Sequence, residues 1–409
     1  MKRPVVMKFG GTSVADPEKI QRAAERAVAA HRRGRAVVVV VSAPGEMTDE
    51  LIGLAHQVSP EPDARELDVL MSTGEMVGIS LFAMACRAKG APAVSLSGPQ
   101  AGFEVDEHHT RASITAIRPK KVLRELAAGR IVAVAGFQGI NPNADIATLG
   151  RGGSDLSAVA LAAVLKAGHC EIFTDVKGVY TADPRIVPEA RKIGRISYEE
   201  MLELSSAGSQ VMQARSIEVA ARYRLPILVR SSFHPSPGTW IVPKSEENME
   251  KSSVSSLSLS KGEVRLSVVN VPDRPGVAAQ ILAELAQARI PVDMIVQSAP
   301  TQRGVNDISI MTPRANASAA STALERIAKR VGAKRVDVHE QVAKVSTIGT
   351  GFRRDPAVAA AMFKALADGG INIHMISTSD LRISCVIDSR HGEQALRLLH
   401  KAFKLGRRC

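Results

Sequence analysis

Five consecutive valines, Val37–Val41, constrain the fold of this chain more than any other stretch. A strand with one face in water alternates apolar and polar residues. This run is apolar at every position, which is typical of a strand buried on both faces of a parallel sheet. Before it, Val5–Phe9 is a second strand candidate, and Pro17–Arg33, ended by Gly34, has the pattern of a helix. Strand, helix and strand in this order predict an α/β fold, an open, mainly parallel sheet sandwiched by helices.

The composition indicates a soluble globular protein of two or three domains, with 409 residues of which 45% are hydrophobic and 23% charged. We expect it in the cytoplasm, because no apolar run is long enough to span a membrane and Met1–Lys8 is too short for a signal peptide. The four cysteines lack disulfide or metal spacing. The formal net charge of +12 is spread along the chain, with only three Tyr and one Trp for stacking. We therefore expect no nucleic acid or membrane partner, and some bias toward anionic substrates.

The segment Thr148–Asp155, with the sequence TLGRGGSD, is the first candidate for a functional loop. Its three glycines allow a sharp turn close to a ligand, and the apolar residues that follow repeat at helical spacing. A glycine-rich turn that leads into a helix directs several N–H groups at one point, which suits a phosphate. Arg151 adds a charge that can bind a carboxylate or phosphate at two points. The alternative is an ordinary glycine turn with Ser154 as the helix N-cap.

Polar residues at the ends of the first two strands are further candidates. Lys8 lies beside Gly10 and Gly11, which form a second possible phosphate-binding turn. Ser42 follows the valine strand, and Thr48 opens the next helix. Ligands of open α/β sheets bind at the carboxyl ends of parallel strands, where these side chains are expected.

The motif Ser72–Glu75 (STGE) interrupts the apolar stretch 67–89. Its Ser-x-x-Glu spacing is typical of a capping box at the start of an apolar helix, and this is the interpretation that the spacing favours. A capping glutamate can still contact a bound amine, which the spacing does not test.

Further strands are expected at 91–96, 131–137, 171–176 and 226–231, and helices at 198–206 and 210–223. Asp175 lies near the carboxyl end of one of these strands. The loop Gly178–Arg185 (GVYTADPR) offers an aromatic ring, two hydroxyls, a carboxylate and an arginine, groups that suit an adenine or ribose pocket.

The segment 235–260 is rich in Pro, Ser and charge, and it predicts a domain boundary. Beyond it, a pattern of strand, helix, strand, strand and helix over 264–331 recurs over 342–403, and each copy corresponds to a small split βαβ sandwich. We expect a catalytic domain over 1–243, a linker over 244–262, and two small domains over 263–340 and 341–409. By analogy these two copies form a regulatory module.

Five motifs together resemble those of aspartokinase, of the monofunctional kind. They are KFGGTSV (8–14), STGE (72–75), TLGRGGSD (148–155), TDVKGVYTADPR (174–185) and ISTS (376–379). The resemblance implies an amino-acid-kinase domain with the carbamate-kinase-like fold, followed by two ferredoxin-like ACT domains. It also implies transfer of the ATP γ-phosphoryl group to the β-carboxylate of L-aspartate, the first step toward lysine, threonine and methionine. Mg²⁺ would be carried mainly by the nucleotide, without a dedicated metal site on the protein. The chain has no Walker A motif.

The resemblance assigns roles to named residues. Arg151 would bind a carboxylate of aspartate and Glu75 its amino group. The catalytic set is Lys8, Gly10, Gly11, Arg151 and Asp155. The aspartate-binding set is Ser42, Thr48, Glu75, Arg151 and Ser154. The ATP-binding set is Lys8, Gly11, Thr174, Asp175, Tyr180, Asp183 and Arg185.

For the C-terminal repeats, the resemblance implies that lysine, threonine or both bind as feedback effectors where ACT domains of two chains meet in a homo-oligomer. Met249 lies where some relatives begin a separate short ACT-only subunit, a second possible partner. The effector-binding set is Asp273, Gly276, Ala278, Asp293, Gln297, Asn372 and Ile373. From the residues alone, Gly276 is simply part of a turn into a helix, and Asp293 an edge-strand charge.

The chain departs from the family pattern at several positions. Gln210 stands where a lysine usually approaches the nucleotide phosphates, and Lys177 replaces a usual acidic or neutral residue and could partly compensate. Leu156 and Ser157 stand where two threonines are common. We expect an active enzyme because Lys8, Glu75 and Arg151 are retained. The alternatives are another amino-acid kinase, such as a glutamate or carbamate kinase relative, and a non-catalytic amino-acid-sensing paralogue. The repeats and STGE argue against the first, and only Gln210 supports the second.

Overall fold

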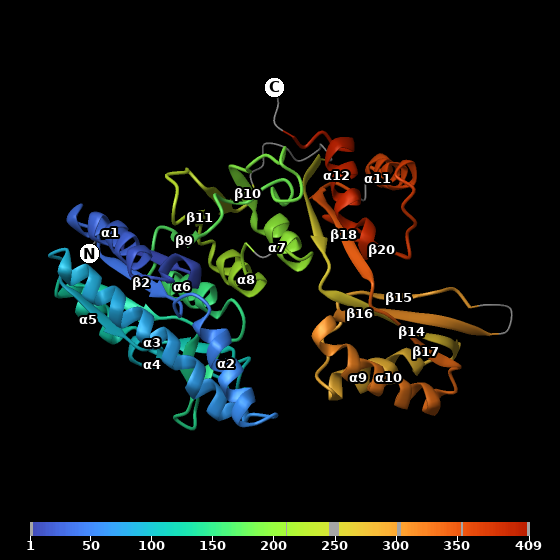
Figure 1. Cartoon of the computed structure of the whole chain (residues 1–409), viewed down its shortest axis with the longest axis horizontal. Helices are drawn as coiled ribbons and strands as arrows, with labels where there is room; N and C mark the ends of the chain where they lie inside the picture. Colours follow the sequence, from blue (N-terminus) through green and yellow to red (C-terminus); the bar gives the residue numbers. More distant parts are fainter. Residues whose placement is uncertain (1–2, 210, 245–252, 301–303, 353–354, 407–409) are drawn as a thin grey trace. The chain divides into compact units, whose positions relative to one another are not determined.

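The computed structural model describes residues 3–209, 211–244, 253–300, 304–352 and 355–406. Gln210 and Met249, which the sequence analysis singled out, lie outside these residues. The described chain divides into two compact units (Figure 1). The first holds residues 3–179, 192–205 and 211–244, and the second holds 180–191, 206–209 and the described part of 253–406.

The first unit is built on an eight-stranded sheet with the strand order β10-β12-β11-β9-β1-β2-β6-β3. Its neighbouring strands are parallel except for the pair β11 and β12. The predicted open, mainly parallel sheet is therefore confirmed. The strands are β1 (Val5–Phe9), β2 (Val37–Val41), β3 (Ala93–Leu96), β6 (Ile131–Ala135), β9 (Cys170–Thr174), β10 (Arg195–Ser197), β11 (Ile227–Ser231) and β12 (Thr239–Val242).

The central strands of this sheet are buried on both faces. Alternate residues such as Phe9, Val39 and Ala133 pack with helices α1 (Pro17–Arg32) and α3 (Ala64–Ala88) in one cluster. The residues between them are equally inaccessible to water, with Val38 and Val40 both 0% exposed, and helix α6 (Gly153–Val164) packs on β1 and β2. The prediction from the five valines is confirmed, because layers of helix lie on both sides of the strand.

A four-stranded sheet, in the order β5-β4-β7-β8, belongs to the same unit. We did not predict it, because its strands are three or four residues long, too short for a clear alternating pattern. These strands are β4 (Phe103–Val105), β5 (Ile114–Ile117), β7 (Gln138–Ile140) and β8 (Ile146–Thr148). The remaining helices of the first unit are η1 (Gly11–Val14), α2 (Met47–Val58), α4 (Gly98–Ala101), α5 (Lys120–Ala127), α7 (Tyr198–Ser206) and α8 (Ala214–Tyr223).

The capping-box interpretation of Ser72–Glu75 is wrong. Helix α3 begins eight residues earlier, at Ala64, and the side chain of its N-cap Asp63 accepts hydrogen bonds from the backbone N–H groups of Arg65 and Glu66. Ser72 lies mid-helix and donates its hydroxyl to the Val69 carbonyl oxygen at 2.7 Å. From the sequence we expected no apolar run long enough to span a membrane, but helix α3 has that length and composition. More than half of its most apolar window is buried inside the unit.

The second unit contains two antiparallel sheets, each with a pair of helices. The orders are β15-β16-β14-β17 and β13-β18-β20-β19, and Figure 1 shows α9 and α10 side by side on the first sheet. The first sheet and its helices comprise β14 (Glu263–Pro272), α9 (Val277–Gln287), β15 (Ile295–Gln297), β16 (Val305–Pro313), η3 (Arg314–Asn316), α10 (Ala317–Val331) and β17 (Arg335–His339). The second comprises β13 (Ser253–Ser260), β18 (Val342–Thr350), α11 (Pro356–Asp368), β19 (Met375–Thr378), β20 (Arg382–Asp388), η4 (Ser389–His391) and α12 (Gly392–Ala402).

Two segments differ from the predicted domain boundaries. Residues 253–260, expected in a linker, form strand β13, which pairs with β18 of the second repeat. The sequence of this strand (SVSSLSLS) resembles a linker because five of its eight residues are serine. Residues 180–191, expected in the catalytic domain, belong to the second unit. There, the Leu257 N–H donates to the Thr181 carbonyl oxygen at 2.7 Å, and Thr181 Oγ1 lies 3.1 Å from His400 Nε2.

The two small sheets of the second unit also contact each other. Met294, Met311, Val342, Met375 and Val386 form a separate apolar cluster that draws residues from both repeats. Beside it, the fully buried ammonium of Lys344 on β18 pairs with Glu263 at 2.8 Å and with Asp293. A buried charge persists only when it is paired, so these carboxylates fix the contact between the repeats.

Helix α3 approaches the end of β2 closely, and this contact predicts the effect of two matched substitutions. A Cβ added to Gly78 would lie 2.6 Å from the Ser42 carbonyl oxygen, whereas one added to Gly53 in α2 would meet no atom within 4 Å. Gly78→Ala should lower the free energy of unfolding by about 1–3 kcal/mol through overpacking. Gly53→Ala should raise it by about 0.5–1 kcal/mol, as expected in a helix interior. Urea unfolding of both variants tests this, and equal stability of the two would contradict it.

Candidate active site

The loops that follow the central strands enclose a cavity of about 780 Å³. Backbone hydrogen bonds hold these loops together: the Ser42 N–H donates to Phe9 at 3.1 Å, the Gly136 N–H to Val41 at 3.2 Å, and the Leu149 N–H to Phe137 at 2.8 Å. Parallel strands place their carboxyl ends at one edge, so turns that are far apart in sequence line one hollow. Of the predicted site residues, the cavity brings together Lys8, Gly11, Ser42, Thr48, Glu75, Arg151 and Ser154.

Lys8 and Asp155 form the central ion pair of this site. The Lys8 Nζ lies 2.6 Å from Asp155 Oδ1, and both side chains are nearly buried, at 13% and 12% exposed. A Cβ on Gly10 would lie 3.2 Å from the Lys8 Nζ, and a Cβ on Gly11 would clash with the carbonyl oxygens of Gly45 and Ala43. Gly10 therefore leaves room beside the ammonium, Gly11 allows the loop at Ala43 and Gly45 to approach closely, and the Asp155 carboxylate holds the ammonium at the cavity wall.

Helix α6 presents an uncapped N-terminus at this edge. Its N-cap is Gly152, in the left-handed region with φ +70°, and no side chain caps it. Ser154, predicted as the alternative N-cap, lies instead inside the first turn and is buried, close to the place where a Cβ on Gly136 would fall. The expectation that Ser154 is the N-cap is therefore wrong. The helix end retains its positive dipole for an anion.

Glu75 is a buried carboxylate with half of its hydrogen-bonding capacity unused. Its Oε1 accepts the Ala43 N–H at 3.2 Å, while its buried Oε2 has no hydrogen-bond partner among the described residues. Burial raises the pKa of Glu75 to about 7. A carboxylate that lacks a partner and lines a cavity suits a cationic ligand such as an ammonium, which would satisfy it.

Arg151 and Arg215 differ in how they are held. The Arg215 guanidinium donates to the carbonyl oxygens of Leu149 and Ala112, at 2.8 and 2.9 Å, so its hydrogen bonds hold the loops together. The backbone carbonyl of Arg151 accepts a hydrogen bond from the Gln213 side chain. Its guanidinium lines the cavity and makes no hydrogen bond or ion pair with the described residues. Arg151 is thus available for an anion.

The predicted nucleotide-binding residues divide between the two units. Thr174 ends β9 of the first unit, and its hydroxyl donates to Asp175 at 2.9 Å, but neither residue lines the cavity. Tyr180, Asp183 and Arg185 belong to the second unit. There Tyr180 packs on an apolar cluster, and Arg185 pairs with Asp183 at 2.7 Å, which lowers the pKa of that carboxyl.

The predicted effector residues all lie in the second unit, mostly at its surface. Asp273 accepts a hydrogen bond from Asn306 at 3.2 Å. Gly276 is the N-cap of α9, in the left-handed conformation, and Ala278 lies in the first turn of that helix. Gln297 ends β15, and Asn372 and Ile373 precede β19. Asp293 is not an isolated edge charge, because it pairs with the buried Lys344.

The cavity also contains residues that the sequence analysis missed, including Thr110, Arg111, Phe137, Gln213 and Arg215. No local motif marks them. Asp68 did carry a signal, since it is a single charge within an otherwise apolar stretch of α3, and it is 0% exposed.

The cavity combines the cationic side chains of Lys8 and Arg151, the uncapped N-terminus of α6, and the Glu75 carboxylate, which has an unused hydrogen-bond acceptor. It can bind a phosphate or carboxylate beside an ammonium group, as an amino acid and a phosphate donor require. The model of the amino acid kinase family matches residues 3–231, and ACT domain models match residues 264–332 and 345–403. The first unit is thus an amino acid kinase domain.

Individual relatives narrow this assignment. The chain is 46% identical over 401 residues to an aspartate kinase of Pseudomonas putida, covering 98% of this chain and 97% of the relative. It is 44% identical over 405 residues to an aspartokinase of Corynebacterium glutamicum, with 98% and 96% covered. The structure of E. coli aspartokinase III in complex with aspartate and ADP is similar, with a TM-score of 0.83, 25% identity, and 98% and 99% of the chains covered. The chain belongs to the aspartokinase family.

The unsatisfied Glu75 predicts a gain in stability when its charge is removed. Its pKa of about 7 lies above the ordinary 4.5, so the carboxylate destabilises the folded state as pH rises from 4.5 through 7. Glu75→Gln should raise the free energy of unfolding by about 2–3 kcal/mol at pH 8, and the gain should shrink at pH 5. Thermal unfolding at both pH values measures this. A variant that is less stable than wild type at pH 8 would contradict the interpretation.

Proposed function

We propose that this protein is an aspartate kinase that transfers the γ-phosphoryl group of ATP to the β-carboxylate of L-aspartate and so forms 4-phospho-L-aspartate. The observation that carries the proposal is the convergence of the Lys8–Asp155 pair, the unsatisfied Glu75 and the available Arg151 in one cavity. Membership of the aspartokinase family supports the same reaction. This reaction is the first step toward lysine, threonine and methionine.

The chemistry needs positioning and positive charge more than proton transfer. The β-carboxylate is ionised at pH 7, so it attacks the γ-phosphorus without a general base. The principal obstacle is repulsion between the two anions and charge that develops on the transferring group. Lys8, the Gly10–Gly11 turn and the N-terminus of α6 supply the opposing field. Asp155 keeps the Lys8 ammonium in place.

The substrate amino acid is held by the remaining residues. Glu75 receives the ammonium group, since its Oε2 needs a donor, and Arg151 binds a carboxylate at two points. Ser42, Thr48 and Ser154 line the same cavity and orient the substrate through their hydroxyls. An incoming ammonium lowers the pKa of Glu75 again, so substrate binding and ionisation of this residue favour each other.

The nucleotide is proposed to bind the first unit through Lys8, Gly11, Thr174 and Asp175. Support comes from the family resemblance of the segment 174–185 and from the bound ADP in the similar E. coli enzyme. Mg²⁺ enters with the nucleotide and neutralises phosphate charge during transfer. Asp155 is engaged with the Lys8 ammonium, so the metal would be held mainly by phosphate oxygens and water.

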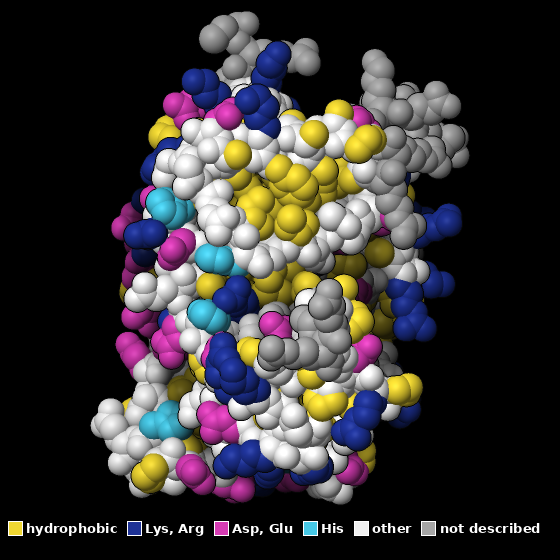
Figure 2. Space-filling model, turned by 90° about the vertical axis from the view of Figure 1, so that its right-hand side faces the viewer, with side chains coloured by type: hydrophobic (Ala, Val, Ile, Leu, Met, Phe, Trp, Pro, Cys, Tyr) yellow, Lys and Arg dark blue, Asp and Glu magenta, His cyan; other side chains and the backbone are white. Residues whose placement is uncertain are grey.

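The second unit is proposed to sense lysine, threonine or both where ACT domains of two chains meet. Two four-stranded sheets end in the free strands β15 and β19, where Ile295 and Ile376 are 52% and 44% exposed. Figure 2 shows apolar side chains gathered on one face of the molecule, with charged side chains around them. A strand edge with exposed isoleucine favours pairing with another chain. Lysine bound in an E. coli aspartokinase III structure supports the same effector class.

We also propose that the protein works in the cytoplasm. The described cysteines Cys86, Cys170 and Cys385 are buried free thiols, and burial raises the pKa of Cys86 and Cys385 to about 12. Thiols kept protonated in this way resist oxidation and need no disulfide partner.

A coupled chemical assay tests the reaction. Purified protein with ATP, Mg²⁺ and L-aspartate should give an acyl phosphate that hydroxylamine traps as the hydroxamate. Lys8→Ala should lower the rate by about 100-fold or more, because it removes a charge that acts on the transition state. Arg151→Ala should mainly raise the KM for aspartate. Lys120→Ala, an exposed lysine at the start of α5, is the matched control and should leave the rate unchanged. ATP binding without any hydroxamate would refute the kinase and favour a regulatory paralogue.

The same assay tests regulation. Added lysine or threonine should suppress the rate, singly or together. Gln297→Ala, at the end of the free strand β15, should raise the inhibitory concentration by about tenfold while the uninhibited rate stays the same. Gln287→Ala, at the end of α9, is the control. Unchanged inhibition in Gln297→Ala would remove this residue from the effector site.

A further inference from the structure

The loop between β4 and β5 closes one side of the cavity and carries an arginine that no motif marked. Thr110 and Arg111 of this loop both line the cavity. Arg111 is exposed, and its guanidinium makes no hydrogen bond or ion pair with the residues that the structure describes. It is the second arginine of the cavity, after Arg151, that is available for an anion.

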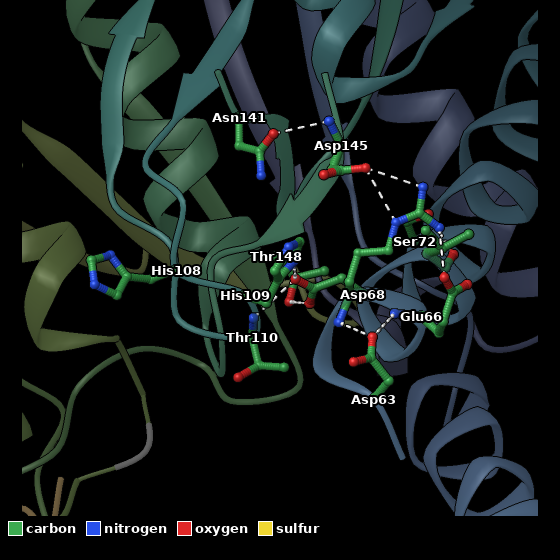
Figure 3. A network of polar contacts seen from close by, with 12 residues as sticks. Asp63, Glu66, Asp68, Ser72, His108, His109, Thr110, Asn141, Asp145 and Thr148 are labelled. Atoms are coloured by element: carbon green, nitrogen blue, oxygen red, sulfur yellow. Dashed lines mark hydrogen bonds and ion pairs between the residues drawn. The ribbon is translucent and has the colours of Figure 1, made fainter. Parts of the chain in front are cut away.

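A buried carboxylate holds this loop in place. Asp68 on α3 accepts hydrogen bonds from His109 Nδ1 at 2.8 Å, from the Thr110 N–H at 2.9 Å and from the Thr148 hydroxyl, as Figure 3 shows. Thr148 begins the segment TLGRGGSD. One carboxylate thus ties α3, the loop and the start of the segment that carries Arg151. The three donors satisfy a charge that would otherwise be unstable in the interior.

The backbone on both sides of Arg111 is fixed. Thr110 has φ +63°, a left-handed conformation that a β-branched residue adopts only when its surroundings enforce it. Its carbonyl oxygen lies against Gly150, where a Cβ would approach to 3.0 Å. Ala112 donates its N–H to Thr148 at 2.8 Å and accepts from Arg215 at 2.9 Å. Strained backbone held by a buried network is a feature of sites where a side chain must be presented in one place.

We propose that Arg111 is a second carboxylate-binding residue, which binds the α-carboxylate of the amino-acid substrate, and that Asp68 is the positioning residue that presents it. The proposal rests on the proposed function. A substrate with two carboxylates matches two available guanidinium groups, and Glu75 takes the ammonium. The α-carboxylate is the one that does not react, so binding it tightly improves affinity without weakening the attacking oxygen.

Kinetics of the full-length protein test the arginine. Arg111→Ala should raise the KM for L-aspartate by about 10–100-fold, the usual range for a charged hydrogen-bonding partner, with kcat and the KM for ATP nearly unchanged. Arg111→Lys keeps the charge but not the two-point geometry, so its KM for L-aspartate should lie between those of wild type and Arg111→Ala. Arg118→Ala removes a charge from the end of the same small sheet, where it pairs with Glu104, and should have no effect.

A substrate analogue locates the contact. With L-aspartic acid α-amide, which lacks the α-carboxylate charge, wild type and Arg111→Ala should behave alike. An equal loss with both substrates would overturn the α-carboxylate assignment, and a loss confined to the KM for ATP would show that Arg111 serves the nucleotide instead.

The positioning role has its own test. Asp68→Asn should raise the KM for aspartate as Arg111→Ala does, and the double variant should show no further rise. Independent, additive losses, or an equal loss of ATP affinity, would leave Asp68 a general structural residue and overturn its role here.

Calorimetric titration with L-aspartate, run beside the assay, separates this proposal from the proposed function. Weaker aspartate binding in Arg111→Ala than in wild type supports the role of Arg111, whether or not the protein shows turnover. Absence of turnover with intact aspartate binding would refute only the proposed kinase activity. Absence of aspartate binding to wild type would refute both.

Discussion

The structure depends on a sheet whose central strands are buried on both faces. Helices α1 and α3 pack on one face of strands β1, β2 and β6, and helix α6 packs on the other face, over β1 and β2. Such strands have no solvent-facing row for polar groups, so the chemistry is confined to the ends of the strands and the turns that follow them. Lys8 illustrates the constraint. It is paired in register with Val40 and Ile172, and it is the single charged residue in β1, one position before the strand ends.

Three buried charges show how the chain places ionised groups away from water. Asp68 is satisfied by three donors and stabilises the loops around the cavity. Lys344 is paired with two carboxylates and joins the two small sheets. Glu75 is left half satisfied, at the wall of the cavity. The first two have complete partners within the fold, whereas the third needs a ligand to complete it. This difference separates structural charges from one that serves binding.

Sequence patterns failed where tertiary contacts override local preference. Ser72–Glu75 has the spacing of a capping box, yet it lies inside α3, because a helix of 25 residues starts at Ala64 and packs against the end of β2. Gly74 and Gly78 permit that close packing, and the same packing puts Glu75 beside the Ala43 N–H. Strand β13 was missed for a related reason, since its pairing with β18 joins residues about ninety positions apart. Local pattern carries no information about such a partner.

The sequence by itself determined the α/β class, the layered sheet and the two C-terminal repeats, and it marked seven of the residues that line the cavity. It could do so because burial on two faces, glycine turns and helix starts each leave a local pattern. Only the tertiary structure decided that Arg111 joins Arg151, that Asp68 ties their loops together, and that residues 180–191 pack in the second unit. These arrangements depend on contacts between residues distant in sequence, whose energies arise only when the chain is folded.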